Sequence, residues 1–278
     1  MRWSTHTGLT VWRDGVDFSN GHAREADGTL LRCSHDQRAI VRTRFGPRGI
    51  AGAGGPSNRR DSVDKIVVSH YRGKRLNSPN DLVVKSDGTI WFTDPPYGIL
   101  SNREGHQAPS EQAANRVFRF DPRLVRSEAG HADETQDALS AVIDWIEHPN
   151  GLAFSPDEKI LYVTDTSAAL GTKSRPGNHH IVAFDVMDEC RLANPKLFAV
   201  IYPGLPDGLR VDTRGWVFSS SLDSVQVFHP DGTRIARIPV PEKIGNLTFG
   251  GPGRDELFIA ASHSLYRNKL REQGVQRP

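Results

Sequence analysis

The sequence has little cysteine, little net charge and no long apolar run, and each shortage excludes a class of protein. Its 278 residues include two cysteines, Cys33 and Cys190, in no metal-ligand spacing, so neither a disulfide framework nor a structural zinc is expected. Lys and Arg number 35 against 33 Asp and Glu, and the net charge of +2 is too small to indicate a nucleic-acid partner or an acidic membrane surface.

Targeting and membrane signals are also missing. No stretch approaches the roughly 20 consecutive apolar residues that span a bilayer. The N-terminal segment has no basic stretch followed by an apolar run, so the sequence predicts a cytoplasmic protein. It contains neither GxSxG nor HExxH, and the esterase and zincin mechanisms therefore lose their usual sequence support.

Helical periodicity is scarce. Only Pro109–Asn115 and Asn268–Gln276 are predicted as short helices. The 26 glycines and 18 prolines instead punctuate short apolar runs, which predicts an all-β chain. A sandwich, a barrel and a propeller are then separated by whether the strands repeat.

A repeated unit is present. Each copy begins at an Asn or Asp that precedes alternating apolar residues, a turn and a second strand; the copies start at Asn20, Asn80, Asn150, Asp207 and Asn246. A third apolar strand in each copy ends in an aromatic residue; these are Phe45, Phe120, Phe184, Phe228 and Tyr266. The copies start 60, 70, 57 and 39 residues apart, which brackets the roughly 40 to 50 residues of a propeller blade once long loops are allowed for.

The start of the chain indicates a further, incomplete unit. The segment around Trp3 resembles the one around Phe228, so Trp3 stands where a third strand should end, and the start of its unit would fall before Met1. We therefore predict a single domain over residues 1–278, an all-β six-bladed β-propeller whose first blade is incomplete. A β-sandwich is the alternative, but it would not require the same residue type at the start of each meander.

Three motifs resemble those of the SMP-30/gluconolactonase/luciferin-regenerating-enzyme-like family of six-bladed propellers, in particular its bacterial gluconolactonase-like members. They are Arg75–Asp81 with Trp91–Gly98, His148–Asp157, and Pro206–Gly208, and the resemblance runs from about residue 2 to about residue 269. It implies a hydrolase of a sugar lactone with one divalent cation on the propeller axis. Ca²⁺ is the preferred ion, with Mg²⁺, Mn²⁺ and Zn²⁺ as alternatives.

The resemblance also implies roles for individual residues. The family binds its metal through a Glu, an Asn and an Asp; the Asn matches Asn150 and the Asp matches Asp207. An Asn that contacts metal-bound water or substrate matches Asn80. The Glu has no counterpart, because its segment would precede Met1, and this departure puts the catalytic assignment in question.

The residues support a similar chemistry on their own. The innermost strand of each blade lines a central channel, so the five Asn and Asp residues that start the units should gather at one end of it. Amide and carboxylate oxygens are ligands that hard cations such as Ca²⁺ take. Asp207 is then a ligand and a candidate general base, and Asn80 would orient water or the sugar ring. The alternative is that Asn and Asp are turn residues with left-handed backbone, which we prefer for Asn20 and Asn246.

Two further side chains are candidates for substrate binding. His35 lies 15 residues past Asn20 and could reach the channel mouth as an acid, a base or a substrate contact; its alternative is a structural histidine. Asp94 has a similar offset from Asn80 and could hold a substrate hydroxyl, or it could cap the turn at Pro95–Gly98. The polar segment 101–114 is either a lid over the channel or a solvated loop.

Taken together, the sequence predicts metal-dependent hydrolysis of a sugar lactone or related cyclic ester, with a small-molecule lactone as the partner and no nucleic-acid or membrane partner. Two alternatives stay open. One is a non-catalytic binding or scaffold propeller that lacks the first-blade Glu, and the other is a strictosidine-synthase-like propeller of different chemistry. The oligomeric state is open as well.

Overall fold

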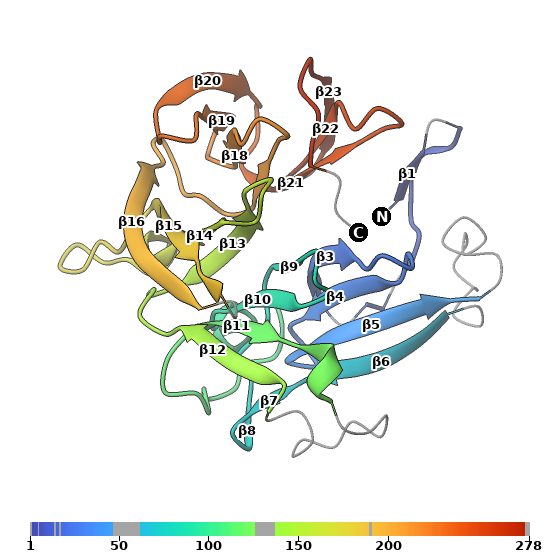
Figure 1. The fold of residues 1–278 in the computed structure, drawn as a ribbon, viewed down its shortest axis with the longest axis vertical. Helices are drawn as coiled ribbons and strands as arrows, with labels where there is room; N and C mark the ends of the chain where they lie inside the picture. The colour runs from blue at the N-terminus through green and yellow to red at the C-terminus, as the bar shows by residue number, and fades with distance from the viewer. Residues whose placement is uncertain are drawn as a thin grey trace.

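The structure, a computed structural model, describes residues 2–4, 6–13, 15–16, 18–46, 62–125, 137–188 and 191–275. Its strands form five antiparallel blade sheets that follow one another in chain order around an axis (Figure 1). Of the two cysteines, Cys33 is a buried free thiol, and Cys190 lies outside the described residues.

Each blade is a meander whose first strand lies nearest the axis. The first blade contains β3 (Ser19–Arg24), β4 (Leu30–Ser34), β5 (Ala39–Phe45) and β6 (Ser62–Val68). The second contains β9 (Leu82–Val84), β10 (Ile90–Asp94), β11 (Arg116–Phe120) and β12 (Leu139–Ile143). The third contains β13 (Pro149–Phe154), β14 (Ile160–Asp165), β15 (His180–Val186) and β16 (Leu192–Val200).

The last two blades complete the set. The fourth contains β17 (Leu209–Val211), β18 (Val217–Ser219), β19 (Ser224–Phe228) and β20 (Arg234–Pro239). The fifth has three strands, β21 (Ile244–Gly250), β22 (Glu256–Ala261) and β23 (Leu265–Lys269). The predicted aromatic residues lie on the third strand of every blade, which confirms the repeated unit.

The described residues form five blades, whereas the sequence predicted six. The difference is a two-stranded hairpin, β1 (Arg2–Ser4) with β2 (Gly8–Thr10), at the place where an incomplete blade was expected. The Trp3 ring lies 5.0 Å from that of Phe258 in the fifth blade, and the Trp12 ring lies 5.7 Å from that of Phe45 in the first. Segment 2–13 therefore contacts both blades that flank the chain ends in Figure 1.

The two predicted helices are wrong. Segment 109–115 is irregular because its polar side chains bind elsewhere: the Ser110 hydroxyl donates to Asn77 Oδ1, and Gln112 Nε2 donates to the carbonyls of Lys74 and Arg75. Those two residues form β8 (Lys74–Arg75), which pairs with β7 (His70–Tyr71). Segment 268–275 contains the end of β23 and no helix. The described helices are α2 (Tyr97–Leu100), η2 (Pro122–Leu124) and η3 (Ser167–Leu170).

The hydrophobic core is divided among the blade interfaces. Each of four buried clusters draws its side chains from two neighbouring blades. Between the second and third blades, the ring of Trp91 meets that of Phe154 edge-on at 5.3 Å, and both are buried. Burying one such ring contributes roughly 2 to 3 kcal/mol, so packing between blades holds the inner strands in place around the channel.

Candidate functional site

The residues that start the repeated units lie together at one end of the channel. Neighbouring blades are joined there by main-chain hydrogen bonds: Gly21 N–H donates to the Asn80 carbonyl at 2.8 Å, and Gly151 N–H donates to the Asp207 carbonyl at 3.0 Å. Gly208 N–H donates to the Gly245 carbonyl at 2.8 Å. The predicted gathering of these unit starts is therefore found, although their chemical roles stay predictions.

Glycine follows three of these residues because the blades approach closely. A Cβ on Gly21 would lie 2.6 Å from the Asn80 carbonyl oxygen, and one on Gly151 would collide with the carbonyl oxygen of Asp207. None of the five Asn and Asp residues that start the units, all within the described chain, has a positive φ. The turn interpretation is therefore wrong for them, including Asn20 and Asn246.

Asn150 and Asp207 form the centre of the site. Asn150 Nδ2 donates to Thr166 Oγ1 at 3.1 Å. The Tyr97 hydroxyl lies 2.9 Å from the same Thr166 oxygen. Because the amide nitrogen is engaged by Thr166, the Asn150 Oδ1 is the atom that can bind a cation. Asn150 is near enough to lower the pKa of the Asp207 carboxyl slightly.

The Asp207 carboxyl has an unusual electrostatic environment. Desolvation raises its pKa to about 7, although Lys243 acts in the opposite direction; Asp81 and Glu104 raise it further. A carboxyl with this pKa exchanges its proton near neutral pH. The site therefore combines a potential proton acceptor with an amide oxygen donor.

His35 is buried and has both ring nitrogens engaged. Its Nδ1 lies 2.8 Å from the Glu104 carbonyl, which can only accept, so Nδ1 carries the proton. Burial lowers the pKa of His35, which favours the neutral ring, and Nε2 then accepts from Asn20 Nδ2 at 3.2 Å. This arrangement links segment 101–114 to the channel end and fixes the Asn20 side chain.

Asp94 lies beneath the channel end and is fully buried. Its Oδ2 accepts from Asn77 N–H at 2.8 Å, and its Oδ1 has no hydrogen-bond partner among the residues described. Burial raises the pKa of Asp94 to about 7, against hydrogen bonds from Asn77 and Ser78 that lower it. The structure thus holds Asp94 against the Asn77–Asn80 segment rather than beside Asp207, and its predicted contact with substrate stays a prediction.

A polar cluster crosses the channel just past the site. Asn246 Nδ2 donates to Asp81 Oδ2 at 3.3 Å, and Arg210 Nη1 lies 3.5 Å from the same oxygen. These three residues come from the fifth, second and fourth blades. We call Asp81, Arg210 and Asn246 the channel cluster. Asn246 thus contributes to a contact across the axis.

Several residues of the site were not singled out from the sequence. Tyr97 and Thr166 border Asn150, while Lys243 and Glu104 influence the charge of Asp207. Lys243 stands three positions before Asn246, and Thr166 directly follows the second strand of its blade, as Pro95 does. Those offsets within the repeat could have identified both residues.

The donor set fits a hard cation. No group of three His, Cys, Asp or Glu residues that could hold a metal occurs in the described part of the chain. Oxygen donors nevertheless occur together: Asn150 and Asp207 start neighbouring inner strands, which the hydrogen bond from Gly151 N–H to the Asp207 carbonyl joins, and desolvation raises the pKa of the Asp207 carboxyl. Amide and carboxylate oxygens with water in the remaining positions suit Ca²⁺ or Mg²⁺.

Fold and site together define a β-propeller with an oxygen-lined channel end, and comparison with known proteins specifies its family. The family model described as SMP-30/gluconolactonase/LRE-like region matches residues 1–263. The chain therefore belongs to this family, as its motifs indicated. In the part of the chain that the structure describes, no helix is long and apolar enough to cross a membrane.

Three similar proteins illustrate the relationship. The chain is 32% identical to the gluconolactonase of Zymomonas mobilis over 92% of its own length and 64% of that protein. It is 30% identical to a pentonolactonase of Haloferax volcanii, covering 78% of this chain and 62% of that one. A solved gluconolactonase structure from Xanthomonas campestris shares 37% identity, with a TM-score of 0.79 over 96% of this chain and 77% of that chain. The chain thus spans less than two thirds of the length of these two curated relatives.

Proposed function

We propose that this chain hydrolyses a sugar lactone, with a divalent cation at the Asn150 and Asp207 end of the channel. The observation that supports it most strongly is that Asn150 and Asp207 start neighbouring inner strands, joined by the hydrogen bond from Gly151 N–H to the Asp207 carbonyl, in a chain whose relatives are named gluconolactonase and pentonolactonase. A lactone is a cyclic ester, so its hydrolysis needs an activated water and a polarised carbonyl.

Asn150 Oδ1 and the Asp207 carboxylate would hold the cation. When bound, a divalent ion such as Ca²⁺ supplies Lewis-acid polarisation of a carbonyl and lowers the pKa of water bound to it. Both residues are fixed before any ligand arrives, because Thr166 accepts from Asn150 and the Ser220 hydroxyl accepts from the Asp207 N–H at 2.8 Å.

The protein residues would divide the remaining work. Asp207, besides holding the cation, is the candidate general base that accepts the proton of an attacking water. Asn80, nearly buried at the neighbouring blade, orients water or a ring hydroxyl. His35 acts as a positioning residue, because its neutral ring fixes the Asn20 side chain and the Glu104 carbonyl.

The test is a pH-stat assay of wild type, Asp207→Asn and Asn80→Ala over a panel of aldonolactones with added Ca²⁺, Mg²⁺, Mn²⁺ or Zn²⁺. Loss of a general base predicts a fall in kcat/KM of about 100-fold or more for Asp207→Asn, with Asn80→Ala between it and wild type. Asp144→Asn, an exposed aspartate between the second and third blades, is the matched control and should match wild type.

Two results would contradict the proposal. Equal rates for wild type and Asp207→Asn would remove Asp207 from the mechanism. Wild type that hydrolyses no lactone with any of these ions would favour the non-catalytic binding propeller instead. Thermal unfolding of each variant separates a catalytic loss from a folding defect.

A further inference from the structure

The other end of the channel contains a cavity of about 450 Å³. Its walls come from the later residues of the same inner strands whose starts form the site: Ala23 and Arg24 of β3, Leu82–Val84, Leu152–Phe154, Arg210 and Val211, and Thr248–Gly250. The channel cluster lies between the two ends. A volume of this size accommodates a small metabolite.

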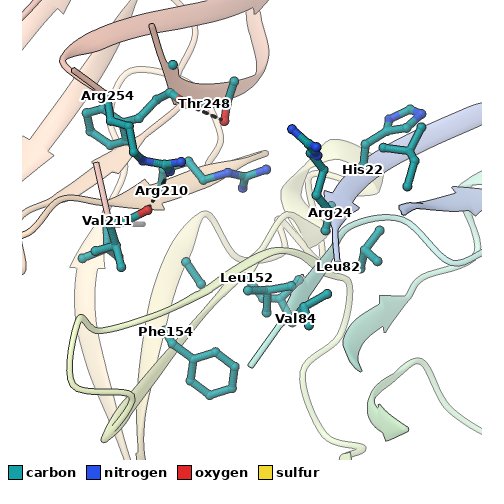
Figure 2. Close-up of a pocket in the computed structure, with 17 residues that line it drawn as sticks. His22, Arg24, Leu82, Val84, Leu152, Phe154, Arg210, Val211, Thr248 and Arg254 are labelled. Atoms are coloured by element: carbon teal, nitrogen blue, oxygen red, sulfur yellow. Dashed lines mark hydrogen bonds between the residues drawn. The ribbon is translucent and has the colours of Figure 1, made fainter. Parts of the chain in front are cut away.

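The cavity wall is basic. Its lining includes Arg24, Arg210 and Arg254 but no Asp or Glu. His22 also lines the cavity, but burial lowers its pKa to about 4, so its ring is neutral near pH 7. Figure 2 shows Arg24 on one side of the cavity and Arg210 and Arg254 on the other. Arg24 is exposed, and no ion pair to Arg24 or Arg254 occurs within the described chain. Arginine on opposite walls favours a ligand that carries an oxyanion.

Two of these arginines are held in position. Arg254 Nη2 donates to the Val275 carbonyl at 2.7 Å, and Arg210 Nη1 donates to the Leu209 carbonyl at 2.6 Å. Arg210 also lies near Asp81, which offsets part of its charge. Arg24 is therefore the wall cation whose charge is least compensated by its described neighbours.

Part of the wall comes from residues whose side chains are buried elsewhere. Leu82, Val84 and Leu152 line the cavity although each side chain is at most 5% exposed, because those side chains pack between blades. The innermost strand of a blade has no further strand on its axial edge, so its N–H and C=O groups face the channel. Such groups hydrogen-bond to ligand hydroxyls.

We propose that this cavity binds a small polyhydroxylated oxyanion, a sugar acid or a sugar phosphate, at a site separate from the Asp207 end. Arg24 and Arg210 contact the anionic group from opposite walls, with Arg254 adding positive charge. Hydroxyl groups bind the exposed edges of the inner strands. The site has no counterpart among the roles that the family resemblance implies.

Isothermal titration calorimetry of the full chain tests the proposal with gluconate, glucose 6-phosphate, inorganic phosphate and neutral glucose as probes. One of the two sugar anions should bind with unit stoichiometry and glucose should not; comparing gluconate with glucose 6-phosphate distinguishes carboxylate from phosphate. Raising the salt from about 20 to about 200 mM should weaken binding, since exposed charges are screened.

Variants locate the binding site. Arg24→Gln should weaken binding about tenfold or more and Arg24→Lys less, because lysine keeps the charge but not the fork. Arg44→Gln is the matched control: it is an exposed strand arginine of β5 that does not line the cavity. Asn150→Ala should bind the anion as wild type does. Absence of sugar-anion binding, equal affinity in Arg24→Gln and wild type, or loss in Asn150→Ala alone would overturn the proposal.

Discussion

The two ends of the channel are built from the same five inner strands yet present opposite chemistry. Where the strands begin, short Asn and Asp side chains supply oxygens; three or four residues further on, Arg210 and Arg24 supply cations. One repeated strand therefore contributes to both proposed sites, and the position along the strand decides which. A repeat identified in the sequence locates the first site but says little about the second.

Space explains part of the difference. At the strand starts, glycines let neighbouring main chains approach within hydrogen-bond distance, so only short side chains fit there. At the other end the cavity leaves room for long arginine side chains. The channel cluster of Asp81, Arg210 and Asn246 separates the two ends and links three blades across the axis.

Removing the positive charge of Arg210 from the channel cluster should have the largest effect on the free energy of unfolding. In Arg210→Met, the Asp81 carboxylate, only 2% exposed, loses its cation and keeps Asn246. Leaving a buried charge without its partner should lower the free energy of unfolding by about 3 kcal/mol or more. Denaturant unfolding monitored by tryptophan fluorescence measures it.

Asn246→Ala provides the comparison, because it removes a neutral donor from the same carboxylate. Its expected destabilisation is about 1 kcal/mol. If Arg210→Met is no less stable than Asn246→Ala, the ion pair does not hold the two ends apart and the cluster is only a hydrogen-bond network.

A smaller loss is expected when the close approach at the site end is disturbed. Gly151→Ala places a Cβ against the Asp207 carbonyl, so the third and fourth blades must separate. Overpacking of this kind lowers the free energy of unfolding by about 2 kcal/mol, and lactone hydrolysis should fall with it because Asn150 and Asp207 move apart. Chemical unfolding and the pH-stat assay measure the two effects.

Gly245→Ala is the matched control. Gly245 lies on β21 in the same ring of contacts, but the nearest atom to its added Cβ is the Ala260 carbonyl oxygen at 3.9 Å, an ordinary contact. Its stability should stay close to that of wild type. Equal destabilisation of both variants would show that glycine is needed for strand conformation at these positions and not for the approach of the blades.

The sequence predicted the parts of the fold that depend on local patterns. Alternating apolar residues followed by a turn mark a meander without tertiary information. In the second blade the turn is Asp87–Gly88, where φ of Gly88 is +83°. The predicted count of six blades differs from the five that the described residues form. The place of the N-terminal segment depends on tertiary contacts, from Trp3 to Phe258 and from Trp12 to Phe45. The predicted helices failed because hydrogen bonds to distant loops override local preference.

For the site, the sequence predicted that the unit starts gather, because those residues recur at a fixed place in the repeat; their chemical roles stay predictions. The contact between Asn246 and Asp81 joins residues 165 positions apart, and no local signal records it. The engagement of His35 depends on a main-chain carbonyl in segment 101–114, which carries no side-chain signature. Arg24 and Arg210 lie at unremarkable positions in the sequence.

A pH-dependent effect, about as large as that of Gly151→Ala, is expected at the buried carboxyl of Asp94. Burial raises the pKa of Asp94 to about 7 from an ordinary value of 3.8, so between these values the folded protein binds a proton that the unfolded chain releases. The stabilisation is complete below about pH 4 and is lost as the pH rises toward 7.

Asp94→Asn keeps a neutral side chain at all pH values. The free energy of unfolding of wild type relative to Asp94→Asn should therefore fall by about 2 kcal/mol between pH 5 and pH 8. Urea unfolding at several pH values measures the difference, with Asp144→Asn as the exposed control. A difference that stays constant with pH, or rises, would show that Asp94 is ionised in the folded protein.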